Sequence, residues 1–270
     1  MARPPRRDAT ARGEPGVTRK FGLLAAVGFA ALACFAIATL PARLIAGTLQ
    51  RFGLSATEFS GTIWSGVAGD VTWRGASLGE LRWRLRPLAL LRARAAAEIS
   101  LAPSDGSASA KIAATRDGTI DLADVHLDLP IEFLARVPTG MARGWHGRVS
   151  GALTELRLVA GWPVAAQGTL HLSSVVMPQL GPDTIGSFDI VLPDPRAAAP
   201  GSPDVTARVM DMEGPLSVDA ALTLATGRSF LLEGTVAPRD SAPPGLVRSL
   251  EFLGPADASG RRPFGVSGTL

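Results

Sequence analysis

The sequence predicts a mainly β protein, with a single N-terminal transmembrane helix followed by a curved, mostly antiparallel β-sheet domain. Two observations predict this class. Residues 21–40 form an uncharged apolar run, and apolar and polar residues alternate with a period of two beyond residue 53. The 30 glycines and 21 prolines are typical of a chain with many turns.

The N-terminus divides into a basic tail, residues 1–20, and the apolar run "FGLLAAVGFAALACFAIATL", residues 21–40. A helix of that length spans about 30 Å, the thickness of one hydrocarbon core. The tail holds six basic and two acidic side chains. Positive flanks stay in the cytoplasm, so the tail is predicted to be cytoplasmic and residues 41–270 to lie across the membrane.

Two further patterns lie in the apolar run. A cleavable signal peptide is the alternative, because Ala36-Ile37-Ala38 fits a cleavage site, but the run is long for a signal sequence and favours a retained anchor. Small residues recur at every fourth position and could form a helix-packing face; an alanine-rich sequence also produces such a stripe by chance. They are Gly22, Ala26, Ala30, Cys34 and Ala38.

The body of the chain reads as strands. "LRWRLR" places Leu81, Trp83 and Leu85 on one face and arginines on the other, and "VHLDL" at 125–129 repeats the pattern. Alternation of this kind is typical of antiparallel sheets with one apolar face. In "FSGTIWSGVAGDVTWRG", residues 59–75, we expect two short strands joined by a glycine-containing turn, with Trp64 and Trp73 packed together across the sheet.

Three segments interrupt the strands. "RPLALLRARAAAEI", residues 86–99, is rich in helix-forming alanine and leucine and predicts a helix. "PIEFLARVP", residues 130–138, predicts one or two helical turns, and the proline-rich residues 192–204 predict a long exposed loop.

The sequence offers little catalytic chemistry. His126, His146 and His171 have no metal-binding spacing, and no phosphate-binding loop or nucleophile elbow is present. The single cysteine, Cys34, can form neither an intrachain disulfide nor a thiolate zinc site. The formal charge of +3 is small, which argues against nucleic-acid binding. We therefore expect a protein that is not an enzyme and needs no cofactor or metal.

The densest charge on the body is the row Arg82, Arg84 and Arg86. Such a row can contact an acidic partner or lipid phosphates. The alternative is that it forms the solvated side of an amphipathic sheet.

Three parts of the chain stand out together. A Gly-x-x-Trp-Ser-Gly element lies just past the apolar run, a Trp-x-Leu-x-Pro-x-x-Leu-Leu element follows it, and a closing region covers residues 222–270. The two elements fall on Gly61, Trp64, Ser65, Gly66, Trp83, Leu85, Pro87, Leu90 and Leu91. In this order the three parts resemble a known family, the type II secretion system protein N. The resemblance covers residues 21–270, and no catalytic residues are carried over from it.

The resemblance implies an inner-membrane protein, single pass, with a periplasmic β-rich domain at 41–270. It implies a non-catalytic accessory role in the export of folded proteins across the outer membrane, through contacts with the inner-membrane platform and the outer-membrane pore. The family also looks similar to periplasmic lipid-handling proteins with apolar grooves. The alternative is therefore a lipid-binding or lipid-bridging module; an open apolar face would favour it, whereas a filled interior would favour a scaffold.

Overall fold

The computed structural model describes residues 38–269, with gaps at 52, 74–75, 91–93, 137–143, 182 and 194–203, together with residues 32, 35 and 36. The chain divides into two units, Met1–Pro41 and Ala42–Leu270. Most of the predicted membrane helix at 21–40 lies outside the described residues. Among those described, no helix has the length and apolar character that a membrane span requires.

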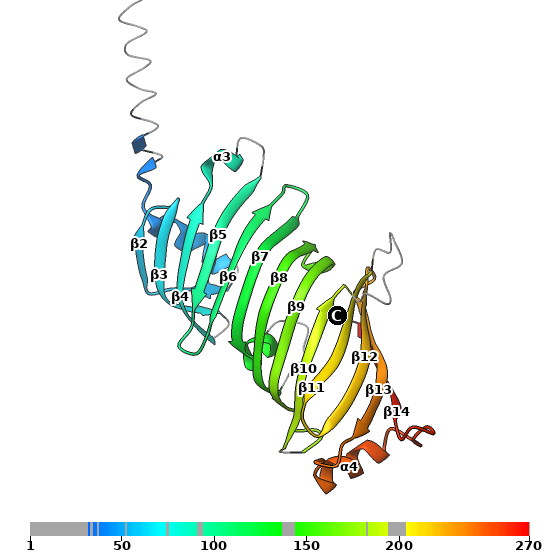
Figure 1. Ribbon diagram of the computed structural model, residues 1–270. Helices are drawn as coiled ribbons and strands as arrows, with labels where there is room; N and C mark the ends of the chain where they lie inside the picture. Colours follow the sequence, from blue (N-terminus) through cyan, green and yellow to red (C-terminus); the bar gives the residue numbers. More distant parts are fainter. Residues whose placement is uncertain are drawn as a thin grey trace, which may run out of the picture. The chain divides into compact units, whose positions relative to one another are not determined.

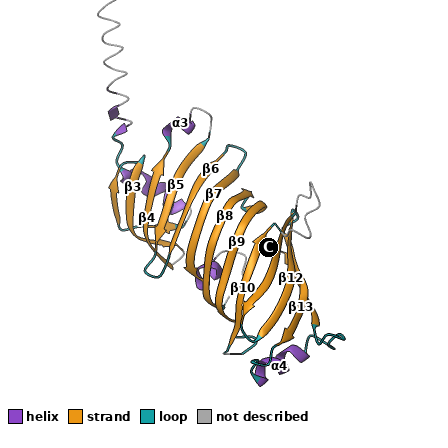
Figure 2. Ribbon diagram, viewed as in Figure 1, coloured by secondary structure: helices purple, strands orange, loops and turns teal. Residues whose placement is uncertain are grey.

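The second unit is built on strands, as the alternation predicts, with short helices between them (Figures 1 and 2). Its elements are η1 Ala42–Ile45, α2 Ala46–Arg51, β1 Leu54–Ser55, β2 Glu58–Gly61, β3 Ser65–Trp73, β4 Ala76–Leu85, α3 Pro87–Leu90, β5 Ala95–Ala102, β6 Ser107–Ala114, β7 Thr119–Pro130, η2 Ile131–Arg136, β8 His146–Val159, β9 Trp162–Val176, β10 Thr184–Leu192, β11 Val205–Glu213, β12 Leu216–Ala225, β13 Ser229–Pro238, α4 Pro244–Glu251 and β14 Arg262–Thr269.

All fourteen strands form one antiparallel sheet that does not close. From β3 to β14 each strand pairs with the next one in the chain, and β1 and β2 both pair with β3. Figure 1 shows the strands lying side by side in this order. Each connection from β3 onward therefore joins neighbouring strands of the sheet, which is the simplest way to build a large antiparallel sheet.

The cross-strand register divides the side chains into two faces. Residues directly opposite each other share a face, and successive residues alternate. We call one side the apolar face; it includes Trp83, Ile99, Ile112, Leu122, Leu156, Leu170, Ile190, Leu222 and Leu232. We call the other the polar face; it includes Arg82, Arg84, Glu98, Lys111, His126, Asp128, Arg148, Arg157, His171, Asp189, Arg208 and Asp219.

Short helical segments pack against the apolar face. Ala42 of η1 joins a buried cluster with Ala68, Val71 and Trp83. A second and larger cluster includes Ile131 of η2 and Leu246 and Leu250 of α4, packed with strand residues such as Phe188. Ile99, Ile112, Leu122 and Leu156, between these clusters, are half-buried.

Three strands contain a β-bulge, and beyond it their apolar side chains still lie on the apolar face. At each bulge a residue other than glycine has a positive φ: 47° at Asp70, 50° at Asp124 and 50° at Ser174. The register shifts at all three sites. Each of these residues precedes a buried valine: Val71, Val125 or Val175.

The bulge in β7 shows what such an extra residue does. Ile120 and Leu122 occupy even positions on the apolar face, whereas Leu127 and Leu129 occupy odd positions on the same face. One extra residue at Asp124 changes the parity between the two pairs. The apolar pattern of the sequence changes phase at the same place.

Two sequence predictions need correction here. Trp64 and Trp73 do not face each other across a hairpin: residues 65–73 form the single strand β3, which puts them roughly 30 Å apart at its two ends. The bulge at Asp70 lies where the sequence suggested a turn. The helix predicted at 86–99 shrinks to α3, Pro87–Leu90, because β5 begins at Ala95 and pairs with β4 and β6.

The segment "PIEFLARVP" contains η2, as predicted. Most of the loop predicted at 192–204 lies outside the described residues.

The bulge in β9 allows a direct test. Ser174 is exposed with a φ of 50°, while its neighbour Ser173 is exposed in ordinary strand geometry. A positive φ costs a residue with a Cβ roughly 1 kcal/mol, and glycine avoids that cost. We expect Ser174→Gly to leave a chain about 1 kcal/mol more stable than Ser173→Gly, as measured by urea denaturation. Equal losses in the two variants would contradict the bulge.

Candidate functional site

The Gly-x-x-Trp-Ser-Gly element forms the turn between β2 and β3. Gly61 has a φ of 87° and pairs with Gly66 across the turn. The backbone N–H of Thr62 donates to the carbonyl oxygen of Ser65 at 2.8 Å. The backbone N–H groups of Trp64 and Ser65 donate to the Thr62 hydroxyl at 3.3 and 3.2 Å. The turn is therefore held by its own hydrogen bonds.

Trp83 of β4 fixes this turn to the sheet. Its indole Nε1 donates to the carbonyl oxygen of Ile63 at 3.0 Å, and the ring is 8% exposed. A Cβ at Gly66 would lie 2.4 Å from Trp83 Cζ2, so the indole needs the bare backbone of a glycine beside it. The backbone N–H of Leu85 also donates to the carbonyl oxygen of Trp64 at 2.7 Å. The two sequence elements thus meet in one structural unit.

The remaining predicted residues fall at several places. Leu85 ends β4 and is half-buried, and Pro87 begins α3, where its missing N–H is not needed. Leu90 ends α3, and Leu91 lies outside the described residues. Of the predicted helix-packing face, Ala38 is an exposed helical residue; Gly22, Ala26, Ala30 and Cys34 lie outside the described residues.

The predicted arginine row lies on the polar face, with all three side chains exposed. Arg82 forms an ion pair with Glu80 at 2.5 Å, and Arg86 pairs with Glu98 on the next strand. Arg84 makes no ion pair with any described residue. Arg84 lies directly opposite Glu98 and lowers the pKa of that carboxyl through its charge, without forming an ion pair.

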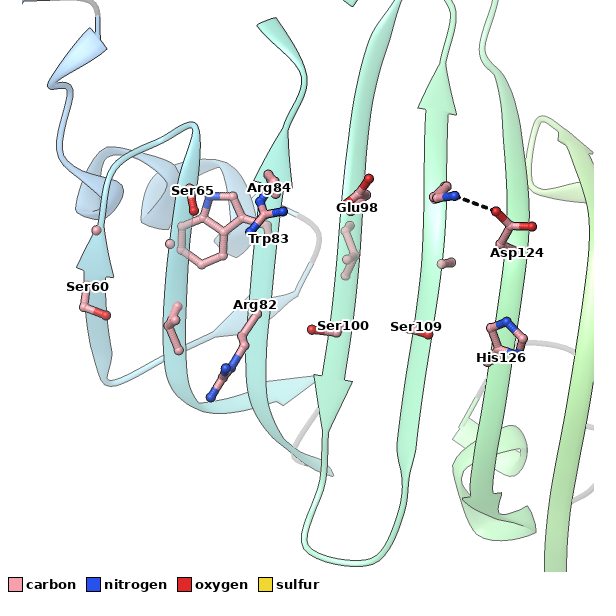
Figure 3. Close-up of a pocket in the computed structure, with 16 residues that line it drawn as sticks. Ser60, Ser65, Arg82, Trp83, Arg84, Glu98, Ser100, Ser109, Asp124 and His126 are labelled. Carbon is pink, nitrogen blue, oxygen red and sulfur yellow. Dashed lines mark hydrogen bonds and ion pairs between the residues drawn. The ribbon is translucent and has the colours of Figure 1, made fainter.

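Arg82 and Arg84 line a hollow of about 670 Å³ on the polar face of β2 to β7 (Figure 3). Side chains from β5, β6 and β7 complete it, and none of them was singled out from the sequence as part of a site. They include Glu98, Ser100, Ser109, Lys111, Asp124 and His126. The Lys111 ammonium lies 2.7 Å from the Asp124 carboxylate, across the register shift between β6 and β7.

Basic partners favour the ionised form of the carboxylates in the hollow. The Arg86 guanidinium donates a hydrogen bond to Glu98 and lowers the pKa of that carboxyl. The Lys111 ammonium likewise lowers the pKa of Asp124. Such exposed pairs contribute little to stability individually. Within the row, Arg84 is the arginine that makes no ion pair with a described residue.

Ion pairs continue across the rest of the polar face. Arg148 bridges Asp128 and Asp105, and its hydrogen bond lowers the pKa of Asp128. Arg157 pairs with Asp121 and Glu155. Asp121 and Asp128 lie on β7, the strand beside β8, so these pairs join side chains that are far apart in the sequence.

The histidines lie at separate positions of the sheet. His126 and His171 lie on the polar face, as the alternation predicts, and His171 hydrogen-bonds to Asp189. Ser150 is directly opposite His171, yet no hydrogen bond links its hydroxyl to that ring. Within the described part of the chain, no three His, Cys, Asp or Glu side chains are grouped to hold a metal.

Sequence reasoning found two of the arginines and the motif residues Gly61, Ser65, Gly66 and Trp83, but it missed the part of the hollow that β5, β6 and β7 supply. Each missing residue stands at a polar position of its own strand. The sequence does not state which positions of separate strands come opposite one another. That depends on the register, including the bulge at Asp124, and the register needs the structure.

Comparison with known proteins places the chain among secretion components. A sequence profile of the family described as type II secretion system (T2SS), protein N, matches residues 53–265. The type II secretion system protein N of Vibrio cholerae serotype O1 is 26% identical over 230 residues, which cover 81% of this chain and 86% of that protein. The protein of the same name from Aeromonas hydrophila is 28% identical over 257 residues, covering 92% and 98% of the two chains. No solved structure matches.

The pairing of Glu98 with Arg86 predicts an acid-dependent stability. Because the pKa of Glu98 is lowered from its ordinary 4.5, its contribution is complete above that pH and is lost as the pH falls through the folded pKa. Glu98→Gln should therefore flatten the loss of stability between about pH 5 and pH 3, measured as the shift of the denaturation midpoint. Glu251→Gln, at an exposed carboxylate without an ion pair among the described residues, is the control. Identical pH profiles for wild type and Glu98→Gln would contradict the prediction.

Proposed function

This chain belongs to the type II secretion system protein N family, and from that membership we propose that it is a non-catalytic accessory component of the system. It supports the export of folded proteins from the periplasm across the outer membrane by contacting other subunits. The observation that carries this proposal is the family match, which spans nearly all of the described sheet.

The proposed location is the inner membrane, with a single pass through residues 21–40. Six basic side chains precede that run, which favours a cytoplasmic N-terminus and a periplasmic sheet. The platform of the secretion system shares this membrane, and the outer-membrane pore faces the same periplasm. Both are therefore the proposed partners.

The polar face supports contact rather than catalysis. Its charges are largely paired with one another, so a partner gains little by approaching most of it. Arg84 differs because it makes no ion pair with a described residue, and its exposed guanidinium in the hollow can form a bidentate pair with a carboxylate. We propose that an acidic side chain of another subunit binds there.

A deletion strain tests the function. Removal of the gene should make exported proteins accumulate in the periplasm, quantified by mass spectrometry of periplasm and medium. Complementation with the full chain should restore export. Normal export without the gene would overturn the accessory role.

The same strain tests Arg84. Complementation with Arg84→Gln should lower export about two- to fivefold, because an interfacial charge that pairs with a partner contributes roughly 1 kcal/mol or less when exposed. Arg248→Gln removes another exposed arginine, on α4, and should restore export fully. Equal export by the two variants would exclude Arg84 as a contact.

A second candidate function has its own observation. Among the described residues the sheet does not close, and the middle of its apolar face is half-buried. Ile99, Ile112, Leu122 and Leu156 lie in adjacent rows there, over four neighbouring strands. A lipid acyl chain can lie along such a surface and remove more of it from water.

Bound lipid would reveal this function. The full chain, purified in mild detergent, should carry acyl chains that mass spectrometry detects. Leu122→Gln places an amide on the apolar face and should lower the bound lipid at least about threefold, since burying an unpaired amide costs roughly 1–3 kcal/mol. Ala123→Gln, one residue on and on the opposite face, should not. Equal lipid in both variants, or none in the wild type, would exclude the lipid function.

A further inference from the structure

The last strand leaves one edge of the sheet unpaired. β14 pairs with β13 from Val236↔Arg262 to Ser229↔Thr269. No other described strand pairs with β14, and the strand order ends there (Figure 1). The outward N–H and C=O groups of an edge strand are free to bind another strand.

The opposite edge of the sheet is protected. It consists of β1 and β2, which are two and four residues long, and β2 begins with the charged Glu58. The helical segment η1 also contacts β2, and α2 contacts β1. Short strands, charge and helical cover are the usual devices that prevent edge pairing.

The β14 edge has few of these devices. Pro263 removes one donor at its start, but residues 264–269, "FGVSGT", are uncharged and contain no further proline. The edge also exposes apolar side chains on both faces. Val266 is 51% exposed on the apolar face, and Leu231 of the adjacent strand is 39% exposed on the polar face.

We propose that β14 binds the β14 strand of a second copy of this chain and joins the two sheets into a dimer. Antiparallel pairing of one strand with its own equivalent is two-fold symmetric, and the two-fold axis stands perpendicular to the sheet. The apolar face of one copy therefore continues as the apolar face of the other. No like charges meet along residues 264–269.

Self-pairing also ends at two copies. Within the described sheet each chain offers one unprotected edge, and the contact occupies that edge. Pairing of β14 with β2 of the next copy would instead extend without limit, but β2 offers four residues and a glutamate. The difference between the two edges thus favours a closed dimer.

The side chains fit a register centred on Val266. In that register Val266 lies beside its own equivalent, and Phe264 of one copy lies opposite Gly268 of the other. An aromatic side chain beside a glycine covers its bare backbone, as Phe230 already does on the other side of Gly268. Thus the residue sizes along the strand complement each other in this register.

Cysteine crosslinking tests the dimer in the full chain. Two differently tagged copies are expressed together, both carrying Cys34→Ser, which removes the single native cysteine, and Val266→Cys. Mild oxidation in cell membranes should give a product of twice 28.0 kDa that carries both tags. Val159→Cys, at a valine that is 42% exposed at the end of β8, is the matched control and should give little product.

A charge variant checks the contact without crosslinking. Val266→Lys places like charges beside each other at the junction and should lower co-purification of the two tagged copies about tenfold. Val159→Lys should leave it unchanged. Separate tagged copies in the wild type, equal crosslinking at both valines, or a Val266→Cys product with a different protein would each overturn the dimer.

Discussion

The register between neighbouring strands is the constraint on which the rest of this structure depends. A shift by one residue at any strand pair would turn its arginines and carboxylates toward the apolar side and its leucines toward water. One register between β4 and β5 places Trp83 opposite Ile99 on the apolar face and Arg84 opposite Glu98 on the polar face. The glycine at position 66 belongs to the same constraint, because it admits the Trp83 ring at the first strand pair of the series.

The bulges show how the register is maintained over long strands. Because neighbouring strands are twisted relative to each other, the pairing of a long strand with its neighbour becomes mismatched along its length. One extra residue restores the pairing, at the cost of a strained φ at that residue. In this chain the correction stands just before a fully or nearly buried valine, at Val71, Val125 and Val175. Burial of the valine on the apolar side offsets the strain at the exposed residue before it.

Much of this architecture could be predicted from the sequence. The alternation in "LRWRLR" and "VHLDL" assigns the right side chains to the two faces, because alternation is a local property. The predicted Trp64–Trp73 contact was wrong because a glycine followed by an aspartate, as at 69–70, is typical of a turn and also fits a bulge. The helix predicted at 86–99 was wrong because alanine also fits a strand whose neighbours supply the pairing. The hollow on the polar face could not be predicted, since its parts come from six strands.

The two faces offer different chemistry to a partner. On the polar face, cross-strand pairs such as Arg148 with Asp128 satisfy most charges, so a partner must either break a pair or use a charge left over. The apolar face has no single group that selects a partner. Its half-buried rows run across many strands and attract any apolar surface in proportion to the area buried. Specific recognition is therefore expected at a single point of the polar face, and extended, less selective contact along the apolar one. For the proposed contact with another subunit, the hollow around Arg84 supplies a guanidinium that can bind a carboxylate.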